Sequence, residues 1–422
     1  HLLKDGDRIA GAVAYWRTTG EFVVFRTKAL VLATGGVGKA WKITSNSWEY
    51  TGDGHALALR AGADLIGMEF QQFHPTGMVW PPSVRGTLVT EGVRGEGGVL
   101  TNSTGARFMF GCIPELYRAD TADTEEEALR WVAGDRTKSR RPPELLTRDV
   151  VARAIRQEVL EGRGSPHGGV FLDIATQRGA DYIRRKLPSM YHQFKTLAGV
   201  DITREPMEVG PTCHYAMGGV RVDAETAAAT VSGLFAAGEV AAGLHGANRL
   251  GGNSLSDLLV FGRRAGLGAA EYACSRSGAP QVDAGRVEQA VREATAPCGR
   301  DGESPHRVHE DLQELMQHNC AIVREQAELE TALSGIDELR DRAARVGVGG
   351  SRAYDPGWHL AVDLRSLLLV AEAVARAALV RTARWGKTIL VVRGAEGALE
   401  VVEEPLEPMP DDLGEYVRGA TP

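Results

Sequence analysis

The chain has 422 residues, of which 43% are hydrophobic and 24% are charged. This composition is typical of a globular protein with more than one core and excludes a disordered, fibrous or disulfide-rich chain. The formal net charge of −7 argues against a general nucleic-acid-binding protein. The five cysteines are scattered without a Cys-x-x-Cys pair, which disfavours a zinc site, a cysteine-held iron–sulfur cluster or a disulfide framework.

A strand followed by a glycine turn occurs twice in the sequence. Residues 29–33 (ALVLA) form a continuous apolar run that predicts a buried parallel strand. In the turn that follows (TGGVG), Gly35 and Gly36 let the backbone approach a ligand closely. The pattern returns at residues 233–238 (GLFAAG), after a long region of different texture. The sequence therefore predicts one α/β domain interrupted by an inserted domain.

Hydrophobic periodicity predicts the remaining elements. Residues 11–26 alternate as a β-hairpin, and helices are expected at residues 55–61, 150–160 and 255–274. Residues 284–380 are mostly helical, because apolar residues recur there at helical spacings. Since heptads are not sustained, a packed helical domain is expected rather than a coiled coil.

The segment Asn253–Asp257 (NSLSD) opens one of these helices. Ser254 is positioned to cap the helix and Asp257 to reach back to it, in a variant of the capping box. Taken alone, this cap is the simpler interpretation. A helix N-terminus also offers free N–H groups and the positive end of a dipole to an anion. A reduced flavin is a suitable anion, because its pyrimidine ring carries negative charge.

Histidines and arginines recur in short polar motifs. The motifs are HPTG at 74–77, TEGVRGEGG at 90–98, RD at 148–149, CHY at 213–215 and ANR at 247–249. Each histidine alone is more often structural, and each arginine alone is more often a surface charge. Burying a charged arginine among apolar neighbours costs free energy unless the arginine faces an anion. The two parallel N–H groups of a guanidinium match the two oxygens of a carboxylate. As a set, the motifs predict an anion-binding site.

Seven motifs occur in one order along the chain. They are TGDG, HPTG, TEGVRGEGG, RDVVAR, MGG, AAGE and GANRLGGNSLSD. In this order they resemble the flavoprotein subunit of succinate dehydrogenase and fumarate reductase. The resemblance implies an α/β flavin-binding domain interrupted by an α+β capping domain and followed by a helical domain. The predicted boundaries are 1–67 and 214–275 for the FAD-binding domain, 68–213 for the capping domain, 276–385 for the helical domain and 386–422 for a C-terminal segment.

The resemblance also implies roles for single residues. The two carboxylates of succinate or fumarate would be held by His74, Thr90, His214 and Arg249. Arg148 would exchange a proton with one substrate carbon while flavin N5 exchanges a hydride with the other, and Glu91 and Arg94 would form the proton relay. The FAD would be contacted by Asp53, Glu239, Ser254 and Leu255, with Gly35 and Gly36 in the glycine turn. No metal ligand is implied.

Partners follow from the same resemblance. Electrons would pass to an iron–sulfur subunit, since this chain carries no cluster motif. Membrane anchor subunits would hold the complex at the inner, cytoplasmic face of the cell membrane, and no nucleic acid is implied. The physiological direction is not fixed by these motifs, because it depends on the flavin potential and on the electron partner.

The chain departs from the family at its start. The family begins with a strand, a GxGxxG turn and a helix, followed by the flavin-linking histidine, whereas His1 corresponds to a position well inside that pattern. We therefore expect an N-terminally incomplete chain without the pyrophosphate motif and the covalent attachment site. Two alternatives stay open: an L-aspartate oxidase-like flavoenzyme, and a non-catalytic fragment or assembly partner.

Overall fold

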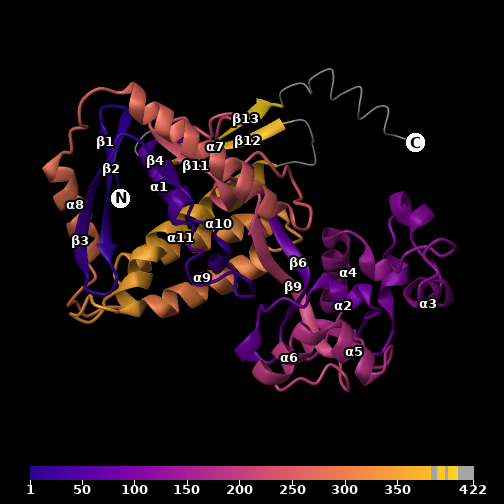
Figure 1. Ribbon diagram of the computed structural model, residues 1–422. Coiled ribbons are helices and arrows are strands. Elements are labelled where there is room, and N and C mark those ends of the chain that lie inside the picture. The colour runs from indigo at the N-terminus through magenta and orange to yellow at the C-terminus, as the bar shows by residue number, and fades with distance from the viewer. Residues whose placement is uncertain (382–386, 395–397, 407–422) are drawn as a thin grey trace.

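The computed structural model describes residues 1–381, 387–394 and 398–406. Two lobes are connected by a pair of long strands, β6 (Gln71–Met78) and β9 (Met207–Ala216) (Figure 1). The larger lobe contains the α/β elements and the C-terminal helices, and the smaller lobe is built by the chain between β6 and β9. The expected inserted domain is therefore a separate lobe that leaves and rejoins the α/β domain through neighbouring strands.

The α/β lobe contains the two strands that precede the glycine turns. β4 (Leu30–Leu32) pairs in parallel with β11 (Leu234–Ala236), which confirms that the first strand is a parallel one and shows that its partner is the second strand. The expectation that the first strand is buried on both faces is wrong, because Val31 is 39% exposed. These two strands form a sheet by themselves, and the described residues leave one face of Val31 uncovered. Within the larger lobe, the helices that belong to this α/β part are α1 (Asp53–Ala61) and α7 (Asn253–Ser275).

Two further sheets complete the larger lobe. The predicted hairpin is part of an antiparallel sheet of β1 (Leu2–Asp5), β2 (Arg8–Trp16) and β3 (Glu21–Arg26). The other sheet has the order β10 (Gly219–Val220), β5 (Leu65–Ile66), β12 (Lys387–Arg393) and β13 (Leu399–Pro405). The described part of the C-terminal segment thus joins the sheet that contains β5 and β10. The rest of that segment, residues 386, 395–397 and 407–422, lies outside the described residues.

The smaller lobe, which we call the capping lobe, has its own hydrophobic core. Its sheet has the order β6, β9, β8 (Val170–Asp173) and β7 (Val99–Thr101), and all three pairings are antiparallel. Its helices are α2 (Glu91–Gly95), α3 (Glu125–Ala133), α4 (Arg148–Leu160), α5 (Ala180–Lys186) and α6 (Pro188–Leu197). Apolar side chains from this sheet and from α4 to α6 form one cluster, separate from the core of the larger lobe.

The C-terminal helices share a core with the α/β lobe. They are α8 (Ala284–Thr295), α9 (Pro305–Asn319), α10 (Gln326–Ala343) and α11 (Pro356–Val380). Leu312, Ile336 and Leu367 belong to one cluster with Leu59 of α1 and Leu65 of β5. Over the described ranges, with their gaps after residues 381 and 394, no helix is long and apolar enough to cross a membrane.

Candidate active site

A cavity of about 690 Å³ lies where the glycine turns of the α/β lobe meet the capping lobe, and we call it the central cavity. Gly35, Glu239 and Ser254, which were expected to contact FAD, line it. Thr90, His214 and Arg249, which were expected to hold a dicarboxylate, line it as well. Residues up to 219 positions apart in the sequence therefore face one space. This size lies within the range of about 300–1,000 Å³ for ligand sites.

The pairing of β6 with β9 brings the two histidine motifs together. Phe73 lies opposite Cys213 in this antiparallel pair, so His74 and His214 are near neighbours with ring centroids 5.8 Å apart. The Nδ1 atom of His74 accepts the backbone N–H of Thr76 at 3.3 Å, which leaves Nε2–H as the donor of that ring. Burial first, and then the nearby Arg94, Arg148 and His214, lower the pKa of His74 to about 2. His74 is therefore a neutral hydrogen-bond donor.

The tautomer of His214 follows from its two partners. Nη2 of Arg249 lies 3.1 Å from Nε2, and Oγ of Ser45 lies 3.0 Å from Nδ1. Because arginine only donates, Nε2 accepts and Nδ1–H donates to Ser45. Burial, followed by the charges of Arg249 and Arg148, lowers the pKa of His214 to about 4. The ring is therefore neutral near pH 7 and orients the guanidinium of Arg249.

One glutamine connects Arg249, which lines the central cavity, with Arg148, which does not. Oε1 of Gln72 accepts Nη1 of Arg148 at 3.3 Å and Nη2 of Arg249 at 3.2 Å. Its Nε2 donates to Oδ1 of Asn248 at 2.8 Å and to the carbonyl of Arg249 at 2.7 Å. Both arginines are thus held by one buried amide on β6, and their like charges favour an anion beside them.

Sequence reasoning missed Gln72 and Ser45. A signal for Gln72 was available, because it lies two residues before His74 and side chains along a strand alternate with a period of two. For Ser45 we find no such signal, since it lies in a loop with no motif around it and contacts His214 only through the fold.

Arg94 and Glu91 lie together on the short helix α2. Arg94 is 1% exposed, and its Nη2 atom lies 3.9 Å from Oε2 of Glu91. Its Nη1 donates to the carbonyl of Glu144, while Nε and Nη2 have no hydrogen-bond partner among the described residues. Burial lowers the pKa of Arg94 to about 10, against the opposing effect of Glu91. The pair places a half-exposed carboxylate beside a buried cation.

Glu239 also lines the central cavity. Its Oε1 accepts the backbone N–H of Ala216 at 2.9 Å, and a Cβ on Gly36 would lie 2.1 Å from that oxygen. Gly36 therefore gives Glu239 its space. Gly35 has φ = 74°, a conformation that favours glycine. Burial raises the pKa of Glu239 to about 7, although the Ala216 N–H and Arg249 act in the other direction.

The start of α7 corrects the predicted helix cap. Gly252 is the N-cap residue, with φ = 85°, and no side chain caps the helix. Ser254 lies inside the first turn, where it faces the central cavity. Asp257 does not reach back, because its Oδ2 lies 3.4 Å from Nε2 of His245 and 3.5 Å from the hydroxyl of Tyr215.

Three residues expected to contact FAD, namely Gly36, Asp53 and Leu255, do not line the cavity. Leu255 is 68% exposed, and Asp53 starts α1, where it accepts the hydroxyl of Thr51 at 2.9 Å. The lining that is present nevertheless fits a flavin. The glycine turn has no side chain that would block a planar ring, and the N-terminus of α7 offers N–H groups to its anionic edge. A side chain at residue 36 would collide with the carboxylate of Glu239, so the glycine keeps that carboxylate in place.

Comparison with known proteins identifies both parts of the chain. The family described as FAD binding domain matches residues 1–255, and the family described as fumarate reductase flavoprotein C-term matches residues 309–387. A CoM/CoB fumarate reductase protein of Methanothermobacter marburgensis is 43% identical over 385 residues, which are 90% of this chain and 63% of that protein. The fumarate reductase flavoprotein subunit of Escherichia coli is 35% identical over 90% of this chain and 61% of that protein.

Solved structures give the same result. Mycobacterium smegmatis Sdh1 in complex with UQ1 superposes with a TM-score of 0.84 at 52% identity, covering 98% of this chain and 68% of that chain. Escherichia coli quinol fumarate reductase superposes with a TM-score of 0.83 at 32% identity, covering 97% of this chain and 71% of that chain. The chain spans 61–63% of the length of the curated relatives it matches. It belongs to the family of flavoprotein subunits of succinate dehydrogenase and fumarate reductase, and the cofactor of this family is FAD.

Proposed function

We propose that the central cavity interconverts succinate and fumarate. The observation that carries this proposal is the joint lining of one cavity by Gly35, Glu239 and Ser254, which are expected to contact FAD, and by Thr90, His214 and Arg249, which are expected to hold the dicarboxylate. Bound FAD supplies hydride acceptance or donation at N5. The cavity can therefore hold a redox ring and a small anion against each other, as hydride transfer requires.

The chain's own residues hold the dicarboxylate. Arg249 offers its charge and its Nε–H, which has no hydrogen-bond partner among the described residues, to one carboxylate, and His214 keeps that guanidinium in place. His74 Nε2–H and the Thr90 hydroxyl are donors for the second carboxylate. Because both histidines are neutral, His74 can add a hydrogen bond and His214 can hold Arg249 without either ring adding charge. Closure of the capping lobe over these groups would exclude water and strengthen their hydrogen bonds and ionic contacts with the substrate.

Arg148 is the proton donor and acceptor in this proposal. Its guanidinium is anchored to Gln72 and lies close to Gly251, where a Cβ would be 3.2 Å from Nη2. The absence of a side chain at residue 251 leaves room for Arg148 to approach the cavity. Glu91, half-exposed and 3.9 Å from buried Arg94, provides a route for the proton between Arg148 and solvent. An arginine can act in this way only in a dry site with a carboxylate nearby.

Partners and location follow from the relatives. The similar structures include an Sdh1 complex with UQ1 and a quinol fumarate reductase, and both names mention a quinone or a quinol. We propose that electrons leave this chain through an iron–sulfur subunit. We also propose that membrane anchor subunits hold the assembly peripherally at the cytoplasmic face of the membrane.

The flavin spectrum of the purified chain supplied with FAD tests this function. We expect a visible flavin band that shifts when fumarate is added, because the dicarboxylate lies against the ring. In the Arg249→Ala variant the band should remain and the shift should be lost. Arg263→Ala, on α7 but outside the cavity lining, is the control and should keep the shift.

Two outcomes would contradict the proposal. A flavin band that no dicarboxylate perturbs would leave a flavoprotein with a different substrate. Faster turnover of L-aspartate than of succinate would indicate an oxidase of amino dicarboxylates instead.

A further inference from the structure

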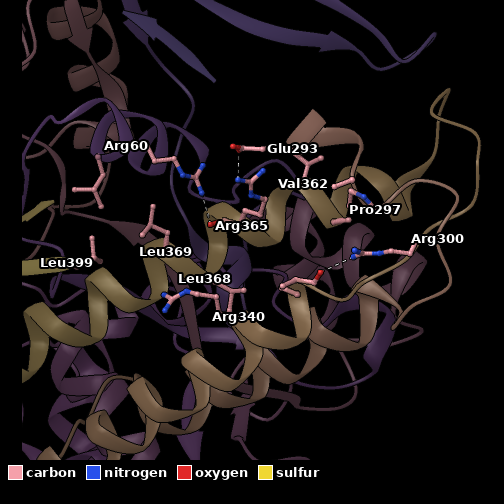
Figure 2. Close-up of a pocket in the computed structure, with 15 residues that line it drawn as sticks. Arg60, Glu293, Pro297, Arg300, Arg340, Val362, Arg365, Leu368, Leu369 and Leu399 are labelled. Carbon is pink, nitrogen blue, oxygen red and sulfur yellow. Dashed lines mark hydrogen bonds and ion pairs between the residues drawn. The ribbon is translucent and has the colours of Figure 1, made fainter. Parts of the chain in front are cut away.

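A second cavity, of about 450 Å³, lies on the other side of the larger lobe and shares no lining residue with the central cavity. The end of α1, the connection between α8 and α9, α10, α11 and β13 surround it (Figure 2). We call it the arginine cavity, after Arg60, Arg300, Arg340 and Arg365, which line it. Neither the proposed chemistry nor the packing of the core uses these four side chains together.

The lining of the arginine cavity is amphipathic. Leu59, Ala361 and Leu368 are at most 4% exposed and present aliphatic surface, joined by Leu369 and Leu399. The charged groups lie around this surface in Figure 2, with Arg60, Arg365 and Glu293 together and Arg300 and Arg340 apart from them. Such a surface suits a ligand with an apolar body and a charged end, because each part meets its complement.

The charge of the lining is unbalanced. Glu293 is the single carboxylate among the lining residues, and it accepts Nη2 of Arg365 at 2.7 Å. Arg340 is paired with Glu372 and with Asp337 of its own helix. Arg300 donates to the carbonyls of Ala344 and Val346 and makes no ion pair among the described residues. An anion entering the cavity would therefore meet Arg300, whose charge is not neutralised by a carboxylate among the described residues.

We propose that the arginine cavity binds an aliphatic monocarboxylate, with the carboxylate at the arginines and the chain over the aliphatic surface. Arginine donors match a carboxylate in geometry, and transfer of the aliphatic chain out of water adds to the affinity. This site is independent of the function proposed for the central cavity. A ligand in this cavity would contact α1 and α11, and both helices contribute side chains to the hydrophobic core of the larger lobe.

Binding of decanoate to the purified chain tests the proposal, measured by titration calorimetry below the micelle concentration. We expect one decanoate per chain, and much weaker binding of decanol or of inorganic phosphate. Arg365→Gln should weaken decanoate binding about tenfold by removing one charge-assisted contact. Val362→Phe, which fills the cavity from α11, should weaken it as well.

Arg376→Gln is the matched control for Arg365→Gln. Arg376 lies on the same helix, is similarly exposed and also has a carboxylate at 2.7 Å, but it does not line the cavity. We expect this variant to bind decanoate like the unchanged chain.

Equal binding by Arg365→Gln and Arg376→Gln would overturn the proposal, and so would no binding of decanoate. Decanol binding as tightly as decanoate would show that the arginines play no part, and phosphate binding as tightly would show a plain anion site. Fumarate and FAD are absent from this experiment, so its result is separate from that of the flavin spectrum.

Discussion

The two sides of the central cavity are built differently. On the proposed dicarboxylate side, His214 and Arg249 line the cavity, and hydrogen bonds link them to Gln72 and Arg148 behind them. His74 lies next to His214, with ring centroids 5.8 Å apart. The flavin side consists of glycine turns, Glu239 and the first turn of α7. In the part of the chain that the structure describes, two of the 23 residues of α7 are buried, against 15 of the 25 residues of α11.

This difference indicates how each side becomes ordered. The dicarboxylate side is fixed by the protein's own contacts, so its geometry exists before a substrate arrives. The flavin side offers space and backbone donors, and Leu258 and Leu259 of α7 are 54% and 77% exposed there. We therefore expect substitutions on the first side to change turnover and substrate affinity, and substitutions on the second side to change flavin retention.

The largest effect should come from Arg148, the proposed proton donor. Arg148→Lys keeps a positive charge but loses the planar fork that Gln72 holds. We expect turnover of succinate in the FAD-loaded protein to fall by about 10²–10⁴-fold or more, as for loss of a general acid. The flavin band and its shift with fumarate should remain. Arg153→Lys, one turn and a half along α4, is the control, and loss of flavin from Arg148→Lys would make Arg148 structural.

A smaller effect is expected at Gln72, the residue that positions two arginines. Gln72→Leu removes the acceptor shared by Arg148 and Arg249, and a hydrogen bond to a charged group contributes about 1.5–3 kcal/mol. We expect the KM for succinate to rise about tenfold or more, with a further loss in kcat because Arg148 is also released. Gln71→Leu, at a neighbouring buried position whose amide contacts Met68, is the comparison. If both variants change stability alike and leave KM unchanged, Gln72 has only a packing role.

On the flavin side, Gly36 tests whether Glu239 needs its present position. Gly36→Ala would place a Cβ 2.1 Å from Oε1 of Glu239, so that side chain must move away from the Ala216 N–H. Overpacking of this kind costs about 1–3 kcal/mol. We expect weaker FAD retention, measured by fluorescence of released flavin, with a lower Tm. Gly179→Ala is the control, because a Cβ there meets nothing within 4 Å; flavin loss equal in both variants would contradict the role of Gly36.

The sequence predicted one side of the cavity better than the other, for physical reasons. His74, His214 and Arg249 lie in the ordered motifs; the pairing of β6 with β9 brings the two histidines together, and Arg249 reaches His214 from a loop. Ser45 was missed because its role depends on a tertiary contact, whereas the strand alternation that relates Gln72 to His74 was present but not used. The cap assigned to Ser254 was wrong, since two glycines allow the chain to enter α7 without a side-chain cap. That β12 joins the sheet of β5 could not be read from a local pattern either, because sheet partners distant in sequence leave no periodicity.

The smallest effect, and the one that compares both sides in one experiment, is the pH dependence of stability. Burial and nearby arginines lower the pKa of His214 from its ordinary 6.5 to about 4, so its contribution is full above pH 6.5 and is lost as the pH falls toward 4. Burial raises the pKa of Glu239 from 4.5 to about 7, so its contribution is full below pH 4.5 and is lost as the pH rises through 7. The two sides therefore respond to pH in opposite directions.

Urea unfolding of the chain between pH 4.5 and 8 measures both contributions. We expect His214→Gln to flatten the loss of stability on the acidic side, because a side chain that cannot take up a proton removes that linkage. Glu239→Gln should instead remove the loss that accompanies the rise through pH 7. His192→Gln, on an exposed position of α6, should leave the profile unchanged. Profiles of all three variants that coincide with that of the unchanged chain would mean that neither group is held in the protonation state described. The dicarboxylate side and the flavin side would then differ in packing alone, and the neutral His214 that orients Arg249 would need another explanation.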